Sequence, residues 1–105
     1  MSPSSRFSAV EWIVKTDTVG VRVNTLGPGQ STPWHFHTAI TDNAFGLDEG
    51  VEVHLREPDL LVRLPPGARQ EILPRRVHKL VNRSDQPARY LLVQGIGTYD
   101  FVEVP

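Results

Sequence analysis

The sequence lacks cysteine altogether, so none of its 105 residues carries a thiol. Disulfide bonds, thiolate metal ligands and a cysteine nucleophile are therefore excluded. A transition-metal site in this chain must be built from imidazole nitrogens and oxygen ligands. The four histidines are thus the first residues to consider for such a site.

A strong charge of either sign is also absent, because 11 basic and 12 acidic residues leave a formal net charge of −1. This balance provides no field that would attract a polyanion, and no stretch alternates basic with aromatic residues, so we expect no nucleic-acid partner. No apolar run approaches the roughly 20 residues that a membrane span needs, and the N-terminus lacks the apolar segment of a signal peptide. We therefore expect a cytoplasmic protein without a membrane partner.

A helical pattern is missing too, since the apolar residues show no convincing period of about 3.6. Nine prolines and eight glycines divide the chain into short segments, as turns do. Alternation with period two is clear instead, for example in Val19, Val21 and Val23, with Arg22 on the opposite face of the strand. The sequence predicts an all-β fold. The expected strands cover residues 10–14, 19–23, 34–40, 43–47, 51–55, 60–64, 70–73, 78–82, 89–94 and 99–104.

The length of the chain fits one domain with one hydrophobic core. Turns that recur about every ten residues are typical of a sandwich or barrel. We expect residues 1–8 to be disordered and residues 9–105 to form a single barrel domain.

Three of the histidines are placed to meet at one point. His35 and His37 are two residues apart, so in a strand their side chains project from the same face and can chelate one ion. His78 begins another predicted strand, and a closed sheet would bring it across to the first pair. Three neutral imidazoles leave coordination positions open for a carboxylate, water or a substrate. His54 shares its strand face with charged residues, which predicts an outer face rather than a ligand.

The surroundings of the first pair resemble the first motif of the cupin superfamily. That motif reads glycine, five residues, His-x-His, three or four residues, glutamate, six residues, glycine. Gly29, His35, His37 and Gly50 occupy the matching positions. The glutamate is missing, and Asp42 lies within the range of its position, with four residues between it and His37.

The surroundings of His78 are similar to the second cupin motif, which reads glycine, five residues, Pro-x-Gly, two residues, His, three residues, Asn. Gly67, His78 and Asn82 match at the right spacing. Leu73 and Arg75 occupy the proline and glycine positions, so the turn before His78 must be built differently. Together the motifs span residues 29–82, about half of the chain.

The resemblance implies a cupin double-stranded β-helix, a barrel of the jelly-roll kind, that holds one divalent transition-metal ion such as iron, manganese, zinc or nickel. His35, His37 and His78 would be three of its ligands. A glutamate normally supplies the fourth in the family pattern, and this chain departs from the pattern there.

Asp42 is the predicted fourth ligand. Among the three residues in that segment it alone carries the anionic oxygen that divalent ions prefer. Thr41, Asn43 and a water molecule are the alternatives.

The resemblance to cupin oxygenases and isomerases implies a metal-dependent enzyme that acts on a small molecule. A non-catalytic barrel that binds a metal or small ligand is the alternative, and the missing glutamate leaves open a scaffold whose site has decayed. Tyr99, Asp100 and Glu71 are candidate acid or base groups by position. Small cupins resemble one another in pairing barrels, and the predicted edge strand at residues 10–14 would gain from a partner, so we expect a homodimer.

Overall fold

The structure is a computed structural model that describes residues 7–105, and in that range it contains ten strands and no helix. The strands are β1 (Ala9–Lys15), β2 (Val19–Leu26), β3 (His35–Phe36), β4 (Thr41–Gly46), β5 (Val51–Leu55), β6 (Leu60–Arg63), β7 (Arg69–Ile72), β8 (His78–Asn82), β9 (Ala88–Gly95) and β10 (Val102–Glu103). The predicted all-β fold is confirmed. Accordingly, no described segment forms an apolar helix that could cross a membrane.

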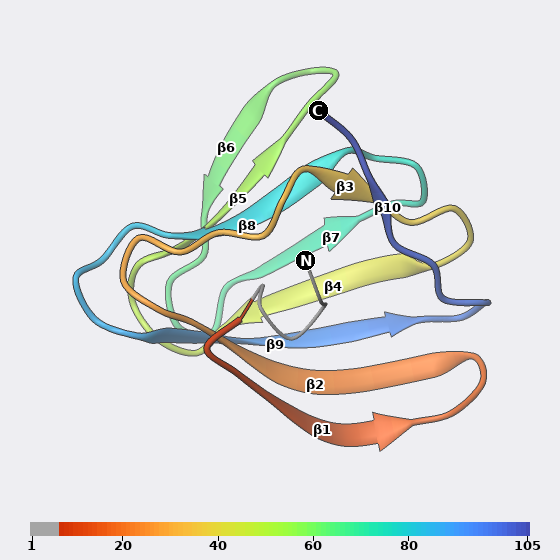
Figure 1. Ribbon diagram of the computed structural model, residues 1–105, viewed down its shortest axis with the longest axis horizontal. Helices are drawn as coiled ribbons and strands as arrows, with labels where there is room; N and C mark the ends of the chain where they lie inside the picture. Colours follow the sequence, from red (N-terminus) through yellow and green to blue (C-terminus); the bar gives the residue numbers. More distant parts are fainter. Residues whose placement is uncertain (1–6) are drawn as a thin grey trace.

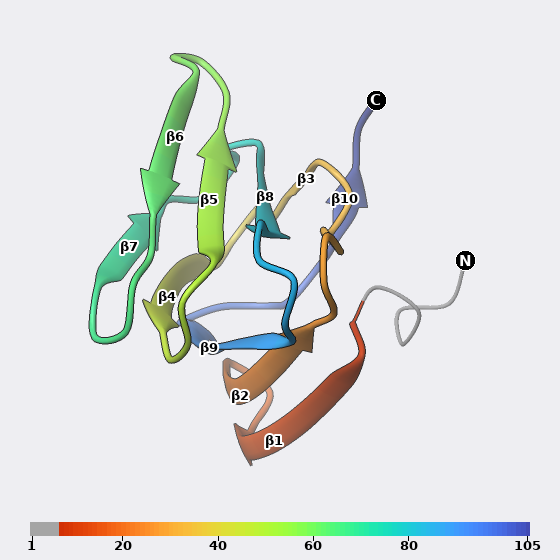
Figure 2. The same cartoon turned by 90° about the vertical axis from the view of Figure 1, so that its left-hand side faces the viewer.

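Two antiparallel sheets of five strands face each other. One has the order β1-β2-β9-β4-β7 and the other β10-β3-β8-β5-β6. The first sheet lies below and the second above in Figure 1, and the rotated view in Figure 2 shows β1 at the outer end of the first sheet. Apart from the hairpins β1-β2 and β5-β6, neighbouring strands come from separate parts of the chain, so residues far apart in the sequence meet inside the barrel.

The core lies between the sheets and consists of apolar side chains from both. β5 shows the pattern that builds it: Val51, Val53 and Leu55 are buried, while Glu52 and His54 alternate with them on the other face. His54 Nε2 lies 3.0 Å from a carboxylate oxygen of Glu52. The fourth histidine therefore belongs to the outer face, as the sequence predicts.

In β2, unlike β5, the alternating valines lie on the outer face of the sheet. Its valines point away from the core, and the inward face carries Gly20, Arg22, Asn24 and Leu26, the last two fully buried. The register explains this, because β2 pairs Arg22 with Leu92, whose side chain faces the core. Asn24 is tolerated inside because its amide donates a 3.1 Å hydrogen bond to the Tyr90 hydroxyl.

Two predicted strands are much shorter than the sequence indicates. The prediction for residues 34–40 leaves only β3, and that for residues 99–104 leaves only β10. These two strands pair with each other at two positions, and β3 meets β8 at one. The segment after β3 leaves the ladder because Thr38 is bound by the Asp100 carboxylate, which accepts from its amide at 2.8 Å and from its hydroxyl at 2.6 Å.

The asparagine of the second motif fixes the chain before β9. Asn82 is fully buried, and its amide donates to the carbonyls of Leu26, Gly27 and Gln86 at 3.0, 3.1 and 2.7 Å. Gly50, from the first motif, has a φ of 106°, and a Cβ there would lie 2.9 Å from the Asn82 side-chain oxygen. The two motifs therefore support each other through packing as well as through their histidines.

Most of the segment predicted to be disordered, residues 1–8, lies outside the described residues. Phe7 packs against the core, and the Ser8 amide donates a 2.9 Å hydrogen bond to the Thr25 carbonyl.

Candidate metal centre

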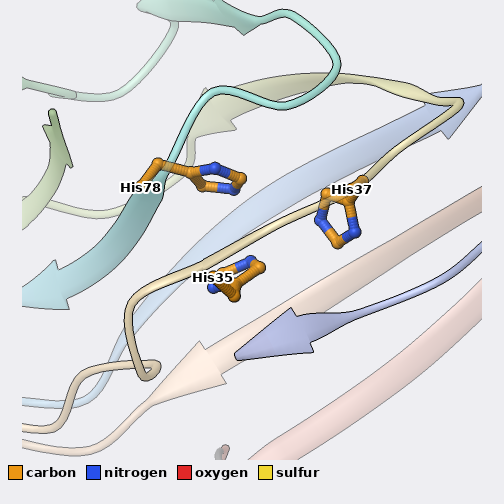
Figure 3. A group of neighbouring side chains, drawn as sticks. All are labelled: His35, His37 and His78. Atoms are coloured by element: carbon orange, nitrogen blue, oxygen red, sulfur yellow. The ribbon is translucent and has the colours of Figure 1, made fainter. Parts of the chain in front are cut away.

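The three motif histidines meet inside the barrel. His35 on β3 is the direct register partner of His78 on β8, and His37 follows β3 by one residue. Their candidate ligand atoms all lie within 4.8 Å of one another, and the rings turn toward a common space in Figure 3. All three side chains are buried, with exposed fractions of 4%, 4% and 1% for His35, His37 and His78. Direct pairing of β3 with β8 in one sheet, rather than closure of a single sheet, thus brings the histidines together.

Each imidazole is held by a backbone carbonyl on its outer side. The Nδ1 atoms of His35, His37 and His78 lie 2.8, 2.5 and 2.8 Å from carbonyl oxygens of other residues. A carbonyl oxygen only accepts, so Nδ1 carries the proton and donates in each ring. Nε2 is then left with a free lone pair, the state that a metal ligand requires.

Asp42 approaches the histidines from the other sheet. Its Oδ2 lies 3.2 Å from Nε2 of His37 and 3.3 Å from Nε2 of His78, and its side chain is 2% exposed. These contacts have the distance of an ion pair but not the angles of a hydrogen bond, so both Nε2 atoms are buried without a hydrogen-bond partner among residues 7–105. The Gln94 amide donates a 3.0 Å hydrogen bond to Oδ1 and so orients the carboxylate.

The alternatives to Asp42 point elsewhere. In β4 the buried positions alternate from Asp42 onward, so Thr41 and Asn43 lie on the opposite face. Asn43 accepts a 2.7 Å hydrogen bond from the Arg69 guanidinium on that face. Of the three residues considered from the sequence, only Asp42 reaches the histidines.

The electrostatics of the cluster keep one imidazole neutral and the carboxylate charged. Burial, reinforced by His78, lowers the pKa of His35 from 6.5 to about 3. Burial also works to lower the pKa of His37, but the adjacent Asp42 carboxylate outweighs it and the pKa is raised. Burial works to raise the pKa of Asp42, and the contacts with His37 and His78 outweigh that effect and hold it well below its usual range.

This set of groups fits one divalent transition-metal ion. Two buried imidazole nitrogens without a hydrogen-bond partner are costly in a metal-free protein. Ligand atoms about 2.1 Å from an ion and at right angles lie about 3 Å apart, close to the separations between Asp42 and the two Nε2 atoms. Imidazole with carboxylate is the donor set of iron, manganese, zinc and nickel sites.

The C-terminal segment forms one wall of the cluster. The Phe101 ring stacks on His35 with centroids 4.1 Å apart, and Tyr99 lies 5.6 Å from the His37 ring. Asp100 supplies the carbonyl that holds His37, while its carboxylate is bound by Thr38. Of the three candidate acid or base groups, Tyr99 and Asp100 therefore lie beside the site, and Glu71 is exposed on β7.

The turn before His78, which the sequence predicts to be built differently from the motif, still has a left-handed residue at the position of the motif glycine. Arg75, in the position of the motif glycine, has a φ of 69°, a conformation that favours glycine. Its amide donates a 2.7 Å hydrogen bond to the His37 carbonyl. The following residue, Arg76, provides the carbonyl that holds His78. The turn thus links the two histidine segments.

Sequence reasoning missed two groups that support the site. Gln94 orients Asp42, and the Asp100 carbonyl orients His37. Gln94 could have been noticed, because it is a polar residue in an otherwise apolar alternation of β9. The contact with the Asp100 carbonyl could not have been predicted, because every residue has a backbone carbonyl whatever its side chain.

No family model matches the sequence, and the curated proteins give no match. Solved structures do match. An uncharacterised conserved protein with a double-stranded β-helix domain from Klebsiella pneumoniae superposes with a TM-score of 0.81, covering 99% of this chain and 90% of its own at 22% identity. An RmlC-like cupin from Desulfovibrio desulfuricans has a TM-score of 0.71, covering 88% and 84% at 20% identity.

An oxalate oxidase in complex with the substrate analogue glycolate matches with a TM-score of 0.80, covering 99% of this chain and 57% of its own at 18% identity. These likenesses show the fold: it is the double-stranded β-helix of the cupins, as the motifs predict.

Proposed function

We propose that this protein binds one divalent transition-metal ion through His35, His37, His78 and Asp42, and that it is an enzyme of the oxygenase or isomerase type acting on a small molecule. The observation that carries the metal proposal is the pair of buried Nε2 atoms without hydrogen-bond partners, which face the same carboxylate. The similarity to an oxidase complexed with glycolate supports a small-molecule substrate.

The bound ion would supply Lewis-acid activation of a small molecule at its open positions. The chain supplies the rest. Backbone carbonyls hold the histidines with their Nε2 lone pairs inward. The Phe101 ring covers one face of His35 and limits the access of water. The Asp42 carboxylate balances part of the positive charge of the ion.

A non-catalytic role is favoured by one observation. The cavity at the histidine cluster has a volume of about 10 Å³, roughly the room of one water on this measure. An organic substrate does not fit there without movement of the walls. In this second candidate function the ion holds the barrel together and no reaction occurs.

Metal content and metal affinity test the proposal together. Elemental analysis of protein purified without added metal should find close to one equivalent of a divalent transition metal. Calorimetric titration of the metal-free protein with Zn²⁺ should show a single site that His78→Ala weakens by about tenfold or more. His54→Ala is the matched control, since His54 lies on the outer face of the same sheet. Equal losses in both variants would contradict the proposed site, and metal binding without turnover on any small carbonyl compound or enediol would favour the non-catalytic role.

We also propose that two copies associate through the outer face of the first sheet. The β2 valines share this face with apolar side chains of β9 and β4, all half-buried: Val19, Val21, Val23, Phe45, Leu91 and Val93. The edge strand β1 is exposed along its whole length, which leaves an unpaired ladder beside that face. Sedimentation should show a dimer at micromolar protein. Val21→Lys should disrupt this dimer, whereas Leu61→Lys on the exposed β6 should not.

A cytoplasmic location and the absence of a nucleic-acid partner stay predictions.

A further inference from the structure

A second pocket opens beside the histidine cluster, under the hairpin of β1 and β2. Its volume is about 130 Å³, comparable with the cavity of about 150 Å³ that accepts benzene in another protein. Arg22 and Gln94 line both this pocket and the small cavity at the histidines. Tyr99, whose ring lies 5.6 Å from His37, lines the pocket as well. The two spaces are therefore separated only by a few side chains.

The sheet register places the pocket on the same inward face as Asp42. Lys15, Gly20, Gln94 and Asp42 form one row of directly paired residues across β1, β2, β9 and β4. Adjacent strands are about 4.8 Å apart, so Gly20 lies about 10 Å from Asp42. Gly20 has no side chain to fill the row, and a Cβ there would lie 3.2 Å from the Trp12 ring. A molecule above Gly20 would thus have the proposed metal centre within reach.

The guanidinium of Arg22 lies in this pocket, and no described residue provides it with an anionic partner. Its Cζ is 5.0 Å from the centroid of the Trp12 ring and 6.0 Å from that of Tyr99. Its Nε is buried and has no hydrogen-bond partner in the part of the chain that the structure describes. None of the ion pairs between residues 7 and 105 involves Arg22. An unpaired charged donor of this kind is costly, and a bound carboxylate would satisfy it.

The remaining lining indicates what kind of molecule carries that carboxylate. Lys15, whose Nζ lies 4.6 Å from the Trp12 ring centroid, adds a second positive charge, and Asp17 is the one acidic residue of the lining. Aromatic and aliphatic side chains make up much of the wall: Trp12, Ile40 and Tyr99. The pocket therefore combines a net positive charge with an apolar surface large enough for a ring or a branched chain.

We propose that this pocket binds a small organic monocarboxylate, whose carboxylate is held by Arg22 and whose apolar body lies against Trp12. As the substrate pocket of the adjoining metal centre it rests on the proposed function, which it deepens by naming the substrate class. The binding of the carboxylate itself requires no metal and can be measured separately.

Titration of the metal-free wild-type protein with benzoate, followed in ¹⁵N-¹H spectra, tests the pocket without any substitution in it. The two tryptophans provide a matched pair, because Trp34 also has two cations over its ring, Arg56 at 4.0 Å and Lys79 at 4.7 Å, but does not line the pocket. Benzoate should shift the indole N–H signal of Trp12 in a saturable manner and leave that of Trp34 in place. Assignment follows from the signal lost in Trp12→Phe. No saturable shift at Trp12, or equal shifts of both signals, would overturn the proposal.

Affinity measurements then assign the carboxylate contact. Arg22→Gln should weaken benzoate binding by about tenfold or more, and benzamide, which has the same ring but no charge, should bind the wild type more weakly by a similar factor. Arg63→Gln, on the exposed β6 of the other sheet, should have no effect. An unchanged affinity in Arg22→Gln, or equal binding of benzamide and benzoate, would show that Arg22 does not hold the anion. Failure of the Zn²⁺ titration would remove the proposed function and leave a positive benzoate result standing.

Discussion

Substitution of Asp42 by alanine should lower the affinity of the metal site by at least about tenfold, or roughly 1.4 kcal/mol. The carboxylate is buried, its Oδ2 lies 3.2 and 3.3 Å from two imidazole nitrogens, and Gln94 fixes its direction. At an effective dielectric constant of about 20, unit charges 4 Å apart interact by about 4 kcal/mol. A water molecule that replaces the carboxylate recovers part of this energy, so tenfold is the lower bound.

The assay is a competition titration of metal-free protein with Zn²⁺ and a chelator of known affinity. Asn43→Ala is the control, because Asn43 neighbours Asp42 in β4 but faces the other side. His78→Ala should weaken binding whether or not Asp42 is a ligand. An unchanged affinity in Asp42→Ala beside a clear loss in His78→Ala would refute the reasoning and leave a site of three histidines and water.

Three further predictions concern stability. Arg75→Gly should stabilise the protein by about 0.5–1 kcal/mol in urea unfolding, because relief of the left-handed backbone conformation exceeds the entropy cost of glycine. A loss of stability would show that the contacts of the Arg75 side chain stabilise the fold by more than the strained backbone at residue 75 destabilises it. Asn82→Ala should destabilise it by about 3 kcal/mol, at about 1 kcal/mol for each of three hydrogen bonds. Two come from the N–H groups of the side-chain amide, which share three carbonyls, and one is accepted by Oδ1 from the Ser84 amide. The loss should be visible as a lower melting temperature. In the metal-free protein the pKa of His35 is about 3 when folded and 6.5 otherwise, so folding favours the neutral ring. This contribution to the free energy of unfolding is complete above pH 6.5 and is lost as the pH falls toward 3, at about 1.4 kcal/mol per pH unit. His35→Gln should therefore flatten the dependence of the melting temperature on pH between these values. Equal slopes of melting temperature against pH in the wild type and the variant would contradict the low pKa.

The two histidine segments and the fold could be predicted because their signals are local. His35 and His37 share a strand face by spacing alone, and Gly67 and Asn82 lie at fixed spacings from His78. The orientation of β2 could not be predicted in the same way. Its valines suggest a core face, and only the register with β9 reveals that Arg22 and Asn24 face inward.

The second pocket could not be predicted from the sequence, for the same reason. Lys15, Gly20, Gln94 and Asp42 are scattered over four segments of the chain, and no spacing rule connects them. The short pairing of β3 was equally unpredictable, because the alternation of residues 34–40 continues beyond the point where the ladder ends. Such features depend on which strands become neighbours, which single-strand patterns do not encode.

The short ladder between β3 and β8 has a consequence for the way the barrel opens. In the second sheet β3 pairs with β8 at one position, His35 with His78, and the segment before β3 adds an isolated bridge between Ser31 and Val81, while β5 and β8 share five pairs. A junction with such interrupted backbone pairing is where thermal fluctuations should separate the two segments first. An ion bound by both His35 and His78 would cross-link the β3 segment to β8, which lie far apart in the sequence. It would constrain the unfolded chain as a disulfide bond does, although this chain has no cysteine. Binding and release of the metal ion would then control how often this part of the barrel opens locally. Amide hydrogen exchange in the segment from β3 to Thr38 should report this opening most sensitively.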